Sequence, residues 1–157
     1  MLSTIKNRNK SKQSGFTIIE VMIVLAIAGL IMLIIFLAVP ALQRNSRNTQ
    51  IKNDAGNVAG GISTFQSNNN GTMPTSVTGT GSVVITAGTA TDSIKVNGST
   101  AVTSVTTAPG SPLTAPTLGT VKVYLGFRCD NTASARAAAV VYATETSGSS
   151  QAQCIDS

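Results

Sequence analysis

The hydrophobic residues of this 157-residue chain form one long block near its amino end. Between residues 21 and 39 no side chain is charged or strongly polar. At about 1.5 Å per residue, a helix of this length spans roughly 28 Å, close to the hydrocarbon thickness of a bilayer. The pattern therefore predicts a helix that can cross a membrane, which we place at residues 16–42.

A second helical pattern follows, and it is amphipathic. Apolar residues recur at steps of four and three, namely at Ile51, Ala55, Val58, Ile62 and Phe65. This spacing predicts a helix over residues 43–67 that packs one apolar face on the rest of the chain. Asn and Gly at residues 68–71 predict its end, because both tolerate a left-handed backbone. Between the two patterns, Pro40 predicts a helix break, since proline lacks an amide donor and clashes with the preceding turn.

The remaining residues, 68–157, favour strands. Residues 72–120 are rich in Ser and Thr and are interrupted by prolines, which predicts short strands joined by loops. The dipeptide Asn97-Gly98 predicts a hairpin turn between strands at 93–96 and 99–105. Residues 108–116 predict a surface loop, which is either solubilising or a variable or glycosylated surface.

Two later segments predict neighbouring strands. Apolar residues alternate with others along residues 121–127, as in a strand with one buried face. The alanines of residues 135–144 favour a helix, but their Val-Val-Tyr run and short connection favour an antiparallel partner strand. The predicted fold is α+β, with a long N-terminal helix packed on a small antiparallel sheet in a globular head.

Charge is distributed unevenly along the chain. The net charge is +5, yet four of the eleven basic residues are Lys6, Arg8, Lys10 and Lys12. Basic residues beside a membrane segment favour the cytoplasmic side, which predicts a cytoplasmic amino end and an exported remainder. The other basic residues are scattered and not interleaved with aromatics, so a nucleic-acid interface is not favoured.

Glu20 is the single charge in the apolar stretch from Phe16 to Leu42. A carboxylate at the centre of a membrane helix costs about 2.5 to 3.5 kcal/mol, so such acids usually have a partner. A cut between Gly15 and Phe16 would create an amino group at Phe16, which is a cation at neutral pH. That cation could pair with Glu20 of its own or of a neighbouring helix.

These residues resemble the class III signal of type IV pilins and pseudopilins. The resemblance rests on the basic tract, Gly15, Phe16, Glu20 and the apolar run behind them, over roughly residues 1–45. It implies that a prepilin peptidase removes the leader, residues 1–15, and methylates the new nitrogen of Phe16. It also implies that Glu20 acts in assembly, where it sets the register between subunits.

Cys129 and Cys154 are the two cysteines, and both fall in the portion that would be exported. An even count in an oxidising compartment favours a disulfide, with two free thiols as the alternative. The resemblance agrees, because pilins commonly close a C-terminal loop in this way. A metal site is not expected, since the chain has no histidine and no second cysteine pair.

Neither an enzyme nor a cofactor is expected. The chain has no histidine and six acids, which show no paired arrangement or metal-ligand run. A catalytic role is therefore not favoured.

The leading hypothesis is a structural subunit, the major pilin of a type IV pilus. It would be held in the bacterial inner membrane, cut after Gly15 and polymerised with identical subunits into an extracellular filament through residues 16–42. The expected partners are those subunits, a prepilin peptidase, the inner-membrane assembly machinery and membrane lipid. The alternatives are a pseudopilin of a type II secretion or competence system, and a membrane-anchored or secreted binding domain. Nothing in the sequence chooses among motility, adhesion and DNA uptake.

Overall fold

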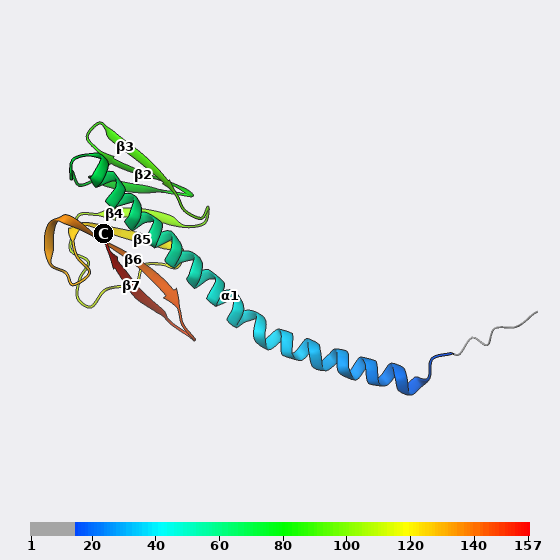
Figure 1. The fold of residues 1–157 in the computed structure, drawn as a ribbon. Coiled ribbons are helices and arrows are strands. Elements are labelled where there is room, and N and C mark those ends of the chain that lie inside the picture. The colour runs from blue at the N-terminus through cyan, green and yellow to red at the C-terminus, as the bar shows by residue number, and fades with distance from the viewer. Residues whose placement is uncertain (1–14) are drawn as a thin grey trace, which may run out of the picture. The chain divides into compact units, whose positions relative to one another are not determined.

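The computed structural model describes residues 15–157, which form an α+β arrangement of one helix and one sheet. Helix α1 spans Ile18–Asn68. The strands that follow are β1 (Ser76–Thr80), β2 (Ser82–Ala87), β3 (Ala90–Lys95), β4 (Ala101–Val105), β5 (Thr120–Phe127), β6 (Ala133–Glu145) and β7 (Ser150–Asp156) (Figure 1). The chain divides into two compact units, of which the first ends at Pro40 and the second is Ala41–Ser157.

Helix α1 continues through Pro40. The predicted helix break at this residue is therefore wrong as a break in secondary structure, although the division between the two units falls at the same place. A proline inside a helix removes one backbone hydrogen bond and strains the preceding turn. Residues on both sides of Pro40 are mostly good helix formers such as Leu and Ala, so the helix resumes without a gap.

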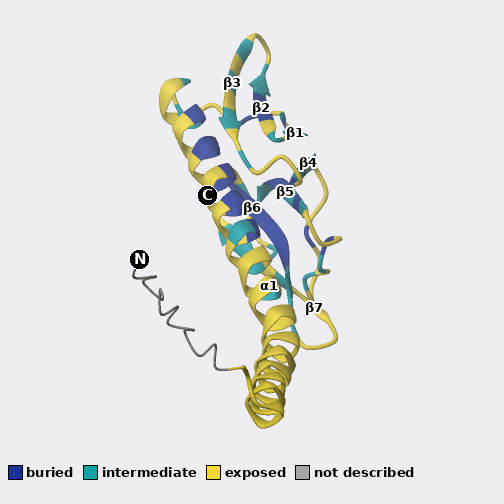
Figure 2. Ribbon diagram, turned by 90° about the vertical axis from the view of Figure 1, so that its right-hand side faces the viewer, coloured by how far each residue is buried: buried dark blue, intermediate teal, exposed yellow. Residues whose placement is uncertain are grey.

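The second half of α1 presents one buried face to the sheet, as the spacing predicted (Figure 2). The buried residues of α1 are Ile51, Asp54, Ala55, Val58, Ala59, Gly61, Ile62 and Phe65. The helix ends at the predicted Asn-rich run. There Asn70 takes a left-handed φ of 53°, and the amide of Gly71 donates to the carbonyl of Gln66 at 2.7 Å. This six-to-one hydrogen bond is the Schellman ending, and it satisfies one of the last helical carbonyls.

The seven strands form one sheet in the order β3-β2-β1-β4-β5-β6-β7. Strands β1–β3 and β5–β7 are each antiparallel meanders of sequence neighbours, and β4 joins them (Figure 1). Strands β5 and β6 confirm the predictions for residues 121–127 and 135–144. The core between α1 and the sheet contains valines from both meanders. They include Val77 and Val83 from the first and Val121 and Val140 from the second.

One strand pair departs from the predicted antiparallel sheet, because β4 and β5 run parallel. A parallel pair needs a crossover of a dozen or more residues, and residues 106–119 supply it. Part of this segment packs on the face of the sheet opposite α1, where Leu113 contacts a buried cluster of Tyr124, Ala139 and Val141. The predicted surface loop at 108–116 is therefore partly a cover for that face.

The predicted hairpin at Asn97-Gly98 is also wrong. Strand β3 pairs with β2, whereas β4 pairs with β1 and β5. Asn97 stands at the first position of a turn, where its carbonyl accepts from the amide of Thr100 at 2.9 Å and its side chain accepts from the amide of Ser99 at 3.0 Å. Asparagine side chains commonly stabilise such turns, which compete with the hairpin geometry.

Candidate functional site

The junction between Gly15 and Phe16 lies outside the helix. Residues 15–17 are not helical, and α1 begins at Ile18. Phe16 is 89% exposed. The predicted scissile peptide bond is thus accessible and precedes the first residue of the helix. The basic tract and the rest of the predicted leader, residues 1–14, lie outside the described residues.

Thr17 and Glu20 fix where α1 starts. The Glu20 carboxylate oxygen Oε2 accepts from the backbone amide of Thr17 at 2.9 Å and from its hydroxyl at 2.8 Å. The amide of Glu20 donates to the Thr17 hydroxyl at 3.3 Å. This reciprocal pair is a capping box, which satisfies backbone donors that a helix start leaves without partners.

The capping box adds Thr17 to the residues that the sequence reasoning identified. The pattern Thr-x-x-Glu before an apolar run is its signature, and it was present at residues 17–20. In this uncut chain the nitrogen of Phe16 belongs to a peptide bond, so the pairing of its amino group with Glu20 stays a prediction. Glu20 meanwhile has a local partner in Thr17.

Behind the capping box, α1 is long and apolar enough to cross a membrane by length and composition. None of the apolar stretch that meets this condition is buried in the structure. Large side chains such as Phe36 and Leu37 are each 74% exposed. Such a surface is stable in lipid or against other apolar helices, and an N-terminal helix of this kind fits anchoring in the inner membrane.

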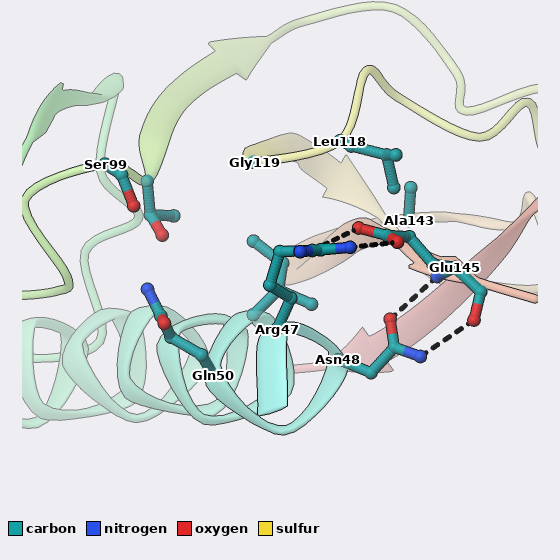
Figure 3. Close-up of a pocket in the computed structure, with 10 residues that line it drawn as sticks. Arg47, Asn48, Gln50, Ser99, Leu118, Gly119, Ala143 and Glu145 are labelled. Carbon is teal, nitrogen blue, oxygen red and sulfur yellow. Dashed lines mark hydrogen bonds and ion pairs between the residues drawn. The ribbon is translucent and has the colours of Figure 1, made fainter. Parts of the chain in front are cut away.

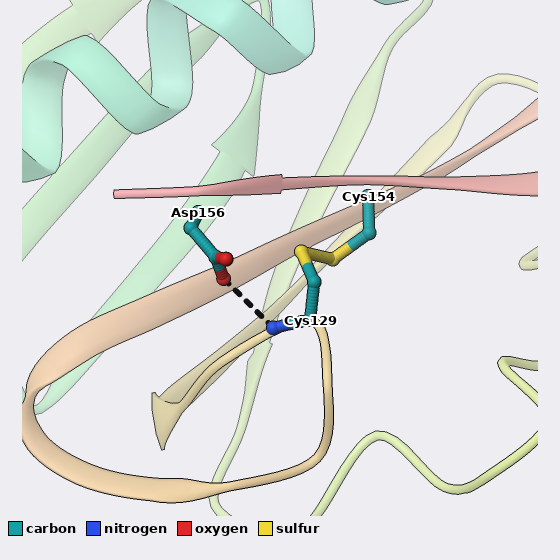
Figure 4. A group of neighbouring side chains, drawn as sticks. All are labelled: Cys129, Cys154 and Asp156. Atoms are coloured by element: carbon teal, nitrogen blue, oxygen red, sulfur yellow. Dashed lines mark hydrogen bonds between the residues drawn. A yellow bond between two sulfur atoms is a disulfide. The ribbon is translucent and has the colours of Figure 1, made fainter.

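The predicted disulfide between Cys129 and Cys154 is present, with the two Cα atoms 5.8 Å apart (Figure 4). It joins the segment after β5 to the edge strand β7. Beside it, the carboxylate of Asp156 accepts from the amide of Cys129 at 2.7 Å. Both sulfur atoms are used by the disulfide, so this cluster of Cys129, Cys154 and Asp156 fixes the C-terminal segment and offers no thiolate ligands.

A polar contact, not anticipated from the sequence, ties α1 to the end of β6 (Figure 3). The Arg47 guanidinium donates to both carboxylate oxygens of Glu145, at 2.7 and 2.8 Å. The Asn48 side chain donates to the Glu145 carbonyl at 2.8 Å and accepts from its amide at 2.7 Å. We call Arg47, Asn48 and Glu145 the clasp. Its hydrogen bonds from Arg47 hold the pKa of Glu145 below its ordinary value, and the charges of Arg47 and Arg44 act in the same direction.

Comparison with known families bears on the amino-terminal segment. Residues 10–36 match the family model of the prokaryotic N-terminal methylation motif. The match includes the Gly15–Phe16 junction, the capping box and the first part of α1. The chain therefore carries a class III signal peptide of the type IV pilin kind.

This motif supports a type IV pilin-like or pseudopilin protein. It implies processing by a prepilin peptidase and assembly into a pilin-type filament. No curated protein and no solved structure matches the chain.

Proposed function

We propose that the protein is a structural subunit, the major pilin, of a type IV pilus. After cleavage behind Gly15 it waits in the inner membrane and is then polymerised with identical copies into an extracellular fibre. The observation that carries the proposal is Glu20. This acid is the single charge of the exposed apolar stretch from Phe16 to Leu42, and it lies four residues after the accessible junction at Phe16.

In the proposed fibre, the apolar halves of neighbouring α1 helices pack together and exclude water. The Phe16 amino group of one subunit neutralises Glu20 of another, which removes the penalty of a lone charge and fixes the axial register. Before cleavage the same carboxylate is held by Thr17, so Glu20 has a partner in the precursor as well.

We also propose that the role is structural and not catalytic. Each of the six acids of the chain accepts a hydrogen bond within the described structure. These hydrogen bonds lie in turns, in a helix cap, in the clasp and beside the disulfide. This use of the acids supports a chain whose polar groups maintain the fold.

The first experiment is intact-mass measurement and N-terminal sequencing of the protein from its native membrane and from a sheared surface fraction. We expect a chain that begins with N-methylated Phe16 in both fractions. A chain that begins at Met1 or Leu42 would remove the filament mechanism. Processed protein in the membrane but absent from long surface fibres would indicate a pseudopilin.

A matched set of variants separates the charge of Glu20 from its cap. Glu20→Gln keeps a side-chain acceptor but removes the charge, whereas Thr17→Ala removes the capping hydroxyl and keeps the charge. We expect Glu20→Gln and Glu20→Ala to be inserted and cleaved but to form few fibres by electron microscopy. Thr17→Ala should still form fibres. Normal fibre formation by the Glu20→Gln variant would refute the proposed role of the charge in assembly.

A further inference from the structure

Within the second unit, helix α1 is held to the head in two different ways. From Ile51 to Phe65 the helix buries a regular apolar face, and we call this stretch the seam. Residues 41–50 bury no side chain, since each is exposed or half-buried. Burial therefore stabilises the seam, whereas the stretch before it depends on polar contacts, chiefly the clasp.

The clasp is open to solvent on its helix side. The Arg47 side chain is 56% exposed and that of Glu145 is 18% exposed. Ion pairs with an exposed partner typically contribute about 0.2 to 1 kcal/mol and are screened by salt, and bidentate pairs such as this one are among the stronger of them. The clasp thus gives residues 41–50 a defined position but resists opening less than the buried seam does.

A cavity of about 320 Å³ lies beside the clasp, between α1 and the sheet (Figure 3). Its wall includes Gln50 from the helix, Ser99 from the β3–β4 turn and Leu118 from the segment before β5. Nearby, a hollow of about 250 Å³ is lined by Arg44 and Asn45 together with Thr146 of the β6–β7 turn. These open spaces adjoin residues 41–50 of the helix. Separation of this stretch from the sheet would therefore break no packed apolar contact comparable to those of Val58 or Phe65.

We propose that the clasp is a releasable contact that lets residues 41–50 of α1 separate from the head while the seam stays docked. Release moves the first firm attachment of the helix from Arg47 to Ile51 and leaves a longer free segment before the head. The opening itself is a property of the single chain. The use of the opening rests on the proposed function. The longer free segment lets a subunit adapt when it leaves the membrane or when a fibre is stretched.

Hydrogen–deuterium exchange of the full chain in detergent micelles tests the opening. We expect the amides of residues 43–50 to exchange at least about a hundredfold faster than those of residues 54–65, because local openings need less free energy than loss of a buried seam. Arg47→Ala should raise exchange at 43–50 by about fivefold and leave 54–65 unchanged. Lys52→Ala is the matched control, since it removes an exposed cation from the same helix and should change neither segment.

Swapping the charges of Arg47 and Glu145 adds a second test, because restored protection cannot result from loss of structure. Arg47→Glu should open residues 43–50, and Arg47→Glu combined with Glu145→Arg should restore their protection. Equal protection of 43–50 and 54–65 in the wild type would overturn the proposal, as would an Arg47→Ala effect that matches Lys52→Ala. These readings come from micelles without fibres, so they are independent of whether the protein forms a pilus.

Discussion

The carboxylate of Asp54 on α1 and the hydroxyl of Thr100 lie 2.6 Å apart inside the head, and both residues are buried. The other carboxylate oxygen of Asp54 accepts from the amide of Asn97 at 3.0 Å. A single acid in the seam therefore holds the turn between β3 and β4 against the helix, at the point where the predicted hairpin does not form.

Replacement of Asp54 by Ala should destabilise the head by about 1 to 3 kcal/mol, because it leaves the buried Thr100 hydroxyl and the Asn97 amide without their acceptor. Chemical unfolding of the full chain in detergent measures this loss. Asp92→Ala is the control, since Asp92 accepts from the adjacent amide of Ser93 on an edge strand. Its effect should stay within about 0.5 kcal/mol. Equal losses for the two variants would contradict the role given to Asp54.

Two adjacent glycines of α1 should respond to alanine in opposite ways. A Cβ atom at Gly60 meets nothing within 4 Å, whereas one at Gly61 would lie 2.7 Å from Cγ2 of Ile94. Gly60→Ala should stabilise the head by about 0.5 to 1 kcal/mol, because alanine loses less backbone entropy in a helix. Gly61→Ala forces Ile94 to move, and overpacking of this kind costs about 1 to 3 kcal/mol, so the gain should disappear. Thermal unfolding of both variants is the measurement, and equal melting temperatures would refute the contrast.

Loss of the Cys129–Cys154 disulfide should destabilise the head by about 3.5 kcal/mol, the value of the chain-entropy model for a loop of this size. Unfolding of the double variant Cys129→Ser, Cys154→Ser measures the loss. The single variant Cys129→Ser should lose nearly as much, since either change removes the same cross-link. In the wild type, alkylation without reductant should label neither cysteine. Two labelled thiols in the native protein would contradict the pairing.

Acid should release the clasp. The pKa of Glu145 is lowered by the hydrogen bonds from Arg47 and by the charges of Arg47 and Arg44, all of which approach from α1. A lowered carboxyl pKa means that its stabilisation is complete above the ordinary glutamate value of about 4.3 and is lost as the pH falls through the lowered value.

Exchange at residues 43–50, corrected for the intrinsic pH dependence of amides, should therefore rise below about pH 4. Glu145→Gln cannot titrate and should show no such step. A step of equal size in that variant would assign the acid effect to another group.

Several features predicted from local pattern are confirmed by the structure. The apolar spacing from Ile51 to Phe65 gave the seam, the Asn-rich run gave the helix end, and alternation gave β5. The predictions at Pro40 and at Asn97-Gly98 also rest on local pattern and are wrong, and at Asn97-Gly98 the reason is a partner far along the chain. Asn97-Gly98 has the composition of a hairpin, but Asp54, 43 residues earlier, takes its amide. Arg47 and Glu145 lie 98 residues apart, and no spacing rule connects them.

The order of the strands has a consequence for how the head folds. Each meander joins sequence neighbours and can form early from local hairpins, whereas β4 joins the two meanders through non-local pairs, which form slowly. The antiparallel ladder of β4 with β1 consists of Gly79 with Val102 and Thr80 with Ala101. So short a ladder gives little independent stability, and we expect the meanders to come together only as they dock under the seam. The helix that carries the export signal then also acts as the platform on which the two halves of the sheet assemble.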